Sequence, residues 1–392
     1  MQALKWWLGN LQRYWPELAS LAVALSAQVL LARWALEEVA GRRPVLRRVV
    51  KLVAGAASVW VFLGFFFTIQ RFAHRLPEAS WAAWLRGMAL AWALATVAAA
   101  VLWFLWRRVP RFDPRRRKLL QGVGGALVAA PFAGLSFGIL VERTNVRVRE
   151  VKAVLPGLPK DLEGLRLALL SDLHLSPFLS AGQVARAVAM ANELRPHLAL
   201  VTGDLVTWRA ADLEPCLEQL AKLRAEAGVL GCLGNHEAYV KGESFAAMKG
   251  ASLGLEFLRG RSQPLRFGAG VLNVAGVDYQ SRRSPYLRGA ERWIQPGAVN
   301  VLLSHNPDVF PVAARQGYQL TLSGHTHGGQ LAFELFDQQL CVARFFTPYV
   351  YGLYREGPAA IYVTRGIGTV GIPARLGAPP EIALIRLCAT SS

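Results

Sequence analysis

Four long apolar runs in the first 142 residues constrain this chain more than any other feature of its sequence. They are Leu18–Leu36, Leu52–Ile69, Gly87–Trp106 and Leu119–Val141. A run of about 20 apolar residues is long enough to cross a hydrocarbon core of about 30 Å. Ten of the twelve tryptophans lie between Trp6 and Trp106, many near run ends, where indole rings favour the bilayer interface. The runs therefore predict four transmembrane helices, rather than a bundle buried inside a soluble protein.

The positive charge is concentrated beside these runs. Residues 1–152 contain 22 Lys and Arg against 7 Asp and Glu, whereas residues 153–392 contain 22 against 19. A net charge of +18 would fit a nucleic-acid-binding protein if it covered the whole chain. Because the excess flanks the apolar runs, it indicates membrane lipids as partners and no nucleic-acid binding surface.

The same charges predict an orientation in the membrane. The loops after the first and third runs contain 12 Lys and Arg, and the opposite side contains 9; around the last run the numbers are 7 and 4. Cytoplasmic loops carry the excess of positive charge, so the C-terminal half is expected on the extracytoplasmic face of a multi-pass cell-membrane protein. Arg116 and Arg117, followed by Leu119 and Leu120, are similar to a twin-arginine export signal, although a plain basic flank would look the same.

The four cysteines show no metal-binding spacing. They are Cys216, Cys232, Cys341 and Cys388, and no C-x-x-C pair occurs, which excludes a zinc knuckle. Cys232 lies in an apolar, strand-like run and is predicted to be a small buried hydrophobe. An extracytoplasmic domain could form disulfides, but the spacing leaves their pairing open.

Beyond residue 142 the pattern changes to short apolar runs that alternate with amphipathic segments. Strands are expected in "LRLALLSD", "LALVTGD", "GVLGCLGN", "VLNVAGVD", "VNVLLSH", "QLTLSGH", "AIYVTRG" and "EIALIRL", and helices over Ala181–Leu194 and Leu213–Glu226. Continuous apolar strands that alternate with helices predict an α/β layered domain. We expect a transmembrane region over residues 1–142, a linker and first strand over 143–164, and a catalytic domain over 165–392.

Polar side chains follow five of these predicted strands at the point where each strand ends. They are Asp172, His174, Asp204, Asn235, His236, His305, His325 and His327, and they include five of the seven histidines. Loops at the carboxyl ends of the strands in an α/β sheet gather on one edge and form the ligand-binding crevice. These eight side chains are therefore expected to converge.

The same residues carry a family resemblance. "DLH" at 172–174, "GD" at 203–204, "GNHE" at 234–237, the isolated His305 and "GHTH" at 324–327 resemble the ordered motif of the calcineurin-like metallophosphoesterases. The resemblance extends from about Leu155 to Leu387, and its flanks look like the membrane-associated or exported bacterial branch of that family. It implies a βαβα layered sandwich of two packed mixed sheets flanked by helices, and hydrolysis of a phosphodiester or phosphomonoester.

The resemblance also implies a role for each residue. Asp204 would bridge two divalent ions. Asp172, His174 and His327 would complete the first metal site, and Asn235, His305 and His325 the second. A metal-bridging hydroxide would attack phosphorus, and His236 would be a catalytic residue that protonates the leaving oxygen. Ligation by oxygen and nitrogen without thiolate suits manganese first, with iron, zinc or cobalt as alternatives.

Other functions and the substrate remain open at this level. A lipid-linked pyrophosphohydrolase, similar to enzymes that cleave UDP-2,3-diacylglucosamine, would need the opposite topology because that substrate is made in the cytoplasm. A non-catalytic scaffold with this fold should have lost ligands, and none is missing here. The phosphate-ester substrate could be lipid-linked or part of the cell envelope.

Two groups of residues beside the motif have alternative interpretations. Trp208, Arg209 and Tyr239 either border the substrate pocket or pack within their loops. The aromatic segment "FELFDQQLCVARFFTPYVYGLY", Phe333–Tyr354, is either core or a surface that faces the bilayer and a lipid-like substrate.

Overall fold

The structure, a computed structural model, describes residues 2–72, 79–108, 114–281, 285–335 and 338–390. It divides into two compact units. A helical unit contains the chain up to Leu140 together with residues 371–374, and an α/β unit contains residues 141–370 and 375–392. The domain boundaries drawn from the sequence, after residues 142 and 164, stay predictions.

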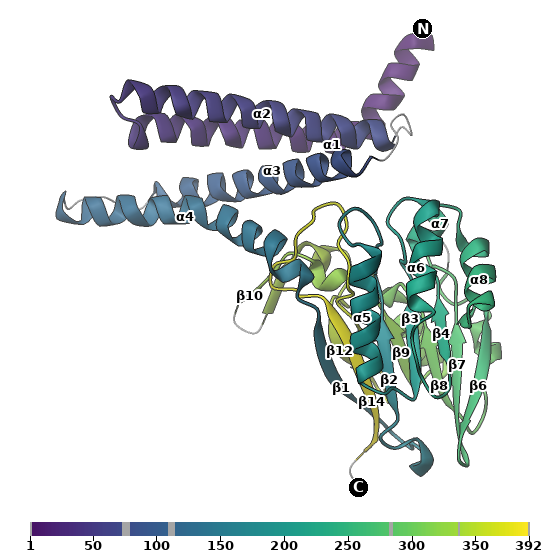
Figure 1. The fold of residues 1–392 in the computed structure, drawn as a ribbon. Coiled ribbons are helices and arrows are strands. Elements are labelled where there is room, and N and C mark those ends of the chain that lie inside the picture. Colours follow the sequence, from purple (N-terminus) through teal and green to yellow (C-terminus); the bar gives the residue numbers. More distant parts are fainter. Residues whose placement is uncertain (1, 73–78, 109–113, 282–284, 336–337, 391–392) are drawn as a thin grey trace. The chain divides into compact units, whose positions relative to one another are not determined.

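The helical unit contains the four expected apolar helices (Figure 1). They are α1 (Gln2–Trp34, continued by the π-helical turn Ala35–Val39), α2 (Pro44–Phe72), α3 (Ser80–Trp106) and α4 (Pro114–Leu140). Within the described residues, four helices are long and apolar enough to cross a membrane. Small residues and interhelical hydrogen bonds are typical of membrane helix contacts. Here a Cβ at Gly64 would lie only 2.3 Å from Ala89 Cβ, and Gln28 donates to the carbonyl of Ala54.

The α/β unit is built from two six-stranded sheets and a separate hairpin, β10–β11 (Figure 1). The first sheet has the order β1 (Arg147–Leu155), β14 (Glu381–Ala389), β2 (Arg166–Leu170), β3 (Leu198–Thr202), β4 (Val229–Cys232) and β5 (Leu255–Phe257). The second has the order β12 (Gly352–Glu356), β13 (Ala359–Val363), β9 (Leu320–Ser323), β8 (Val299–Leu303), β7 (Gly270–Gly276) and β6 (Arg261–Phe267). Both sheets are mixed, because β14 pairs antiparallel with β2, and β12 and β6 pair antiparallel with β13 and β7.

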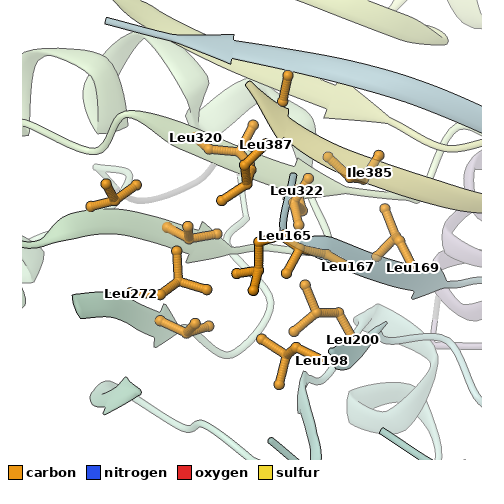
Figure 2. Packing of buried hydrophobic residues seen from close by; sticks show 14 of the residues in the cluster. Leu165, Leu167, Leu169, Leu198, Leu200, Leu272, Leu320, Leu322, Ile385 and Leu387 are labelled. Atoms are coloured by element: carbon orange, nitrogen blue, oxygen red, sulfur yellow. The ribbon is translucent and has the colours of Figure 1, made fainter. Parts of the chain in front are cut away.

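The main core contains buried side chains from both sheets. Figure 2 shows leucines and isoleucine of β2, β3, β7, β9 and β14 meeting there, including Leu167, Leu200 and Leu322. The other face of the first sheet is covered by α5 (Ala181–Glu193), α6 (Leu213–Leu220) and α8 (Glu243–Ser252). The other face of the second sheet is covered by α9 (Phe310–Gln316) and a 3-10 turn over Ala290–Trp293. Continuous apolar strands are what a sheet covered on both faces requires. The expected fold class is confirmed.

One predicted helix is too long. The pattern predicted a helix to Glu226, but α6 ends at Leu220. The side chain of Asn192, at the end of α5, donates to the carbonyl of Lys222 and accepts from the amide of Arg224. These two hydrogen bonds occupy backbone groups that a continued helix would need.

The structure contains no disulfide among the four cysteines. Cys232 is fully buried, as predicted, and all four cysteines are free.

The aromatic segment Phe333–Tyr354 forms β10 (Ala332–Leu335), β11 (Gln338–Cys341), a 3-10 turn over Val342–Phe345 and the first part of β12. Phe333, Leu340 and Phe345 are at least half exposed, so the interpretation of this part as core is wrong.

Candidate metal centre

The eight predicted site residues all follow strands, and both sheets contribute. Asp172 and His174 follow β2, and Asp204 follows β3. Asn235 and His236 begin the short helix α7 (Asn235–Tyr239) directly after β4. From the second sheet, His305 follows β8, and His325 and His327 follow β9. The strand ends of the two sheets thus bring together residues that are far apart in the sequence.

An unusual backbone conformation marks the strand ends. Among the described residues, nine non-glycine residues have a positive φ, and five of them are Asp172 (51°), His174 (49°), Asp204 (53°), His325 (76°) and His327 (53°). The left-handed region costs an L-residue roughly 1–2 kcal/mol. Such conformations cluster at functional sites, where the surrounding structure holds them in place.

Glycines beside the carboxylates make close packing possible. A Cβ at Gly234 would lie 2.1 Å from Asp204 Oδ1, and a Cβ at Gly324 would lie 2.2 Å from Asp172 Oδ2. Real Cβ atoms essentially never approach other atoms so closely. Glycine is therefore required at both positions for the two carboxylates to keep their places.

Asp172, His174 and His327 form the first group. Nε2 of His327 lies 3.4 Å from Asp172 Oδ1, and Nε2 of His174 lies 3.0 Å from Nε2 of His327. Asp172 and His174 are fully buried and His327 is nearly so. The backbone amide of His325 donates to both oxygens of Asp172, at 3.0 and 3.2 Å, and so fixes that carboxylate.

Asp204, His305 and His325 form the second group. His305 Nε2 lies 3.0 Å from Asp204 Oδ2, and His325 Nδ1 lies 3.1 Å from His305 Nε2. Asp204 also lies close to the first group, because His174 Nε2 is 3.4 Å from the same Oδ2 atom. One carboxylate oxygen therefore faces histidines of both groups.

Asn235 gives an independent indication of a ligand. Its side chain is 5% exposed, and among the described residues its Oδ1 has no hydrogen-bond partner. Buried amide oxygens are normally hydrogen-bonded, so an orphaned one needs an explanation. A cation ligated by Oδ1 would supply one. With Asp and His donors and no thiolate, the chemistry of the group fits a divalent metal.

His236 lies beside these groups. Its backbone amide donates to Asp204 Oδ1 at 2.9 Å, and its Nε2 lies 4.0 Å from Asp204 Oδ2. Its Nδ1 is held by the carbonyl of Thr207. The ligand atoms of His174, Asp204 and His236 also lie close enough together to hold a metal ion. The distances are therefore compatible with His236 either as a ligand or as a residue beside the ligands.

The buried carboxylate and histidines of the centre shift one another's pKa values. Burial alone would lower the pKa of His305, but Asp204 beside it raises the pKa to about 10. Burial works to raise the pKa of Asp204, yet His305 and His174 hold it well below its usual range. Burial and the neighbouring His305 lower the pKa of His325 to about 4. The centre therefore favours positive charge next to Asp204.

Two residues that support the centre were missed by sequence reasoning. Glu237, fully buried, accepts hydrogen bonds from the amides of Asp204 (3.0 Å), Leu205 (2.7 Å) and Gly234 (2.8 Å). Arg375, also fully buried, donates to the carbonyls of Gly368, Arg365 and Ala378 as well as His327. The E of "GNHE" was visible in the sequence, but nothing there singles out Arg375 among 44 basic residues.

Aromatic rings lie beside the centre at two positions, one next to His236 and the other next to His325. The rings of Trp208 and Tyr239 lie 4.9 and 5.2 Å from the ring of His236, and they stack on each other at 5.9 Å. Arg209 instead lies 3.8 Å from Asp212 in its own loop. Tyr279, which the sequence did not indicate, lies 5.6 Å from the ring of His325.

Known proteins share this sequence pattern. The family model described as calcineurin-like phosphoesterase matches residues 165–329, a range that contains all eight site residues. A transmembrane protein with metallophosphoesterase domain from Danio rerio is 32% identical over 266 residues, which cover 64% of this chain and 59% of that protein. The metallophosphoesterase YkuE of Bacillus subtilis is 28% identical over 284 residues, covering 70% and 98% of the two chains. A metallophosphoesterase of Helicobacter pylori strain J99 is 31% identical over 288 residues, covering 70% and 73%.

Proposed function

Because this chain belongs to the calcineurin-like metallophosphoesterase family, we propose that it is a membrane-anchored phosphoesterase that uses two divalent ions. Its substrate would be a phosphodiester or phosphomonoester. One observation carries the proposal: the side chains at five strand ends from two sheets meet around Asp204, in a buried group of oxygen and nitrogen donors.

The grouping of the side chains supports two metal sites. Asp172, His174 and His327 would hold one ion, and Asn235, His305 and His325 the other, with Asp204 shared between them. The support is that Asp204 Oδ2 lies close to a histidine of each group, His174 at 3.4 Å and His305 at 3.0 Å, and that Oδ1 of Asn235 is orphaned. Divalent ions, when bound, neutralise charge on phosphate oxygens and lower the pKa of bound water.

His236 would act on the leaving group. The carbonyl of Thr207 holds Nδ1, so Nε2 faces Asp204 and the metal centre. When the bond from phosphorus to the leaving oxygen breaks, the imidazolium form of His236 would deliver its Nε2 proton to that oxygen and become the neutral imidazole. This role requires that His236 does not bind a metal ion. The distances in the centre are compatible with either role, so a substitution has to decide between them.

The donors also bear on metal identity. Nitrogen and oxygen ligands without thiolate suit manganese, iron, zinc and cobalt better than copper(I) or calcium. We propose manganese as the first ion to test. The four apolar helices support the membrane anchor, and the distribution of positive charge supports an extracytoplasmic α/β unit.

Metal analysis of the purified full-length protein, combined with hydrolysis assays, tests the proposal. The protein should bind two divalent ions per chain and hydrolyse bis(p-nitrophenyl) phosphate or p-nitrophenyl phosphate. Removal of the metal by a chelator should abolish hydrolysis, and manganese should restore it. A folded protein that binds no metal and hydrolyses neither compound would overturn the proposal.

A further inference from the structure

An exposed apolar surface lies next to the metal centre in the sequence and in the α/β unit. We call the segment Ala332–Phe346 the apolar hairpin. Its exposed large apolar side chains are Phe333 (61%), Leu340 (50%), Val342 (68%), Phe345 (88%) and Phe346 (64%). Exposed apolar side chains that cluster in this way are typical of a surface that binds a protein or a membrane.

The strand register explains the outward direction of two of these side chains, Phe333 and Leu340; Val342, Phe345 and Phe346 lie in and after the 3-10 turn that follows β11. Phe333 pairs directly with Leu340, so the two share one face of the hairpin. Ala332 pairs with Cys341, and Ala332 is buried on the opposite face. The alternation thus places small residues toward the α/β unit and large apolar ones away from it.

Close packing joins the apolar hairpin to the loop that carries His325 and His327, and hydrogen bonds hold the start of the hairpin and the residues after it to neighbouring loops. A Cβ at Gly329 would lie 2.5 Å from Cys341 Cβ, so this glycine allows the hairpin to pack against the loop. The amide of Ala332 donates to the carbonyl of Leu376 at 2.7 Å. Just beyond the hairpin, Thr347 donates to Asp308 at 2.6 Å, and Thr326 donates to Val350. Whatever the hairpin binds is therefore held beside the metal centre.

The rest of the chain indicates what the hairpin binds. Only six residues, Val141–Val146, separate the last membrane-length helix α4 from β1. A catalytic unit on so short a tether stays near a lipid surface. Arg344 is exposed between Val342 and Phe345, where it suits anionic headgroups. Glu334 in the same segment offsets the charge of Arg344, so apolar insertion, rather than net charge, has to supply the binding.

We propose that the apolar hairpin inserts into the headgroup and acyl boundary of the membrane, and that the metal centre acts on phosphoesters of amphiphiles held there. The second part rests on the proposed phosphoesterase function. Phe333, Val342, Phe345 and Phe346 are the inserting side chains, as in other apolar faces that lie in a membrane interface. The hairpin's attachment to the His325 and His327 loop then brings the phosphate of a lipid headgroup within reach of the ions.

Photo-crosslinking identifies what covers the hairpin. A benzophenone analogue of phenylalanine replaces Phe345 in the full-length protein, which is reconstituted into nanodiscs of phosphatidylcholine and phosphatidylglycerol. The matched control carries the analogue at Met248, which is 70% exposed on α8, on the other side of the α/β unit (Figure 1). After irradiation, lipid adducts are expected at position 345 and not at 248. Adducts to residues 1–140 or to a second copy of the chain, or no preference for position 345, would overturn the proposal.

Activity measurements test the substrate class separately. In the same nanodiscs, Phe345→Ser combined with Phe346→Ser should lower hydrolysis of a phospholipid with a p-nitrophenyl headgroup at least tenfold. Hydrolysis of soluble bis(p-nitrophenyl) phosphate should stay within twofold, and Met248→Ser should change neither. Equal losses on both compounds would contradict the assignment. If the protein hydrolyses neither compound, the phosphoesterase function fails while the crosslinking result still decides membrane docking.

Discussion

At His236 and His305, a backbone carbonyl determines which ring nitrogen faces the metal centre. Thr207 holds Nδ1 of His236 and Thr202 holds Nδ1 of His305, at 2.7 Å for His305. An imidazole whose Nδ1 donates to a carbonyl turns Nε2 toward the centre, where the neutral ring presents a lone pair for a metal and the protonated ring presents an N–H for proton transfer. The two rings are thus oriented in the same way, although we propose a ligand role for His305 and proton transfer for His236.

Substitution of His236 separates these two roles. His236→Asn should leave the metal content at two ions per chain and lower turnover by about 10²–10⁴-fold, because only proton transfer to the leaving oxygen is lost. Metal analysis and steady-state hydrolysis of the same preparation measure both quantities. His197→Asn is the control, since His197 lies outside the centre and accepts a hydrogen bond from the amide of Arg166. Loss of one ion together with activity would instead make His236 a ligand.

At the scale of elements, the strand ends were the predictable part of the site. The order of apolar strands located Asp172 and Asp204 without any knowledge of side-chain positions, because the parallel strands β2 and β3 deliver their carboxyl ends to one edge. His305 was located as a strand end too, but it follows β8 of the second sheet, and a single sheet edge does not account for its place beside Asp204. The early end of α6 was not predictable. It depends on Asn192, thirty residues earlier, whose side chain binds backbone groups at Lys222 and Arg224.

Other elements escaped prediction for related reasons. The role of Arg375 depends on how its own loop, between β13 and β14, folds back on itself, because three of the carbonyls that it binds lie in that loop and the fourth belongs to His327. No local sequence pattern predicts such an arrangement. In the apolar hairpin, the composition of the sequence was compatible with both a buried and an exposed position of its side chains. The pairing of Phe333 with Leu340 places the two side chains on one face of the hairpin, and only their exposure in the structure shows that this face points outward.

The turn between β4 and α7 offers a test at this scale. Gly234 has a φ of −100°, which alanine adopts readily, so Gly234→Ala adds a Cβ without backbone strain. That Cβ would have to displace Asp204 Oδ1, which lies 2.1 Å away. We expect metal content to fall below one ion per chain and turnover to fall at least tenfold, as measured by metal analysis and hydrolysis.

The control for this test is a glycine in a helix. Gly182 lies in α5, and a Cβ added there by Gly182→Ala would have no neighbouring atom closer than 3.9 Å. It should leave metal content and turnover unchanged. Full metal content and normal turnover in Gly234→Ala would contradict the central place given to Asp204.

At the scale of the whole molecule, the orientation in the membrane is the open prediction. The excess of Lys and Arg in the loops after the first and third apolar runs should keep those loops in the cytoplasm. A reporter enzyme that is active only outside the cytoplasm, fused after Ser392, should therefore be active. Protease added to intact cells stripped of any outer layer should remove the α/β unit. Protection of that unit, with an inactive reporter, would place it in the cytoplasm and favour a substrate made there.

The place of β14 in the first sheet has a consequence for the order in which the protein is made. This strand lies between β1 and β2, with residue 147 paired to residue 381. During synthesis, β1 and β2 have to wait for a neighbour that the ribosome adds more than two hundred residues later. Pairings between distant segments form slowly, because the loop between the strands has to close first. The four apolar helices, in contrast, are complete before β1 begins, so the helical unit can form well before the first sheet closes.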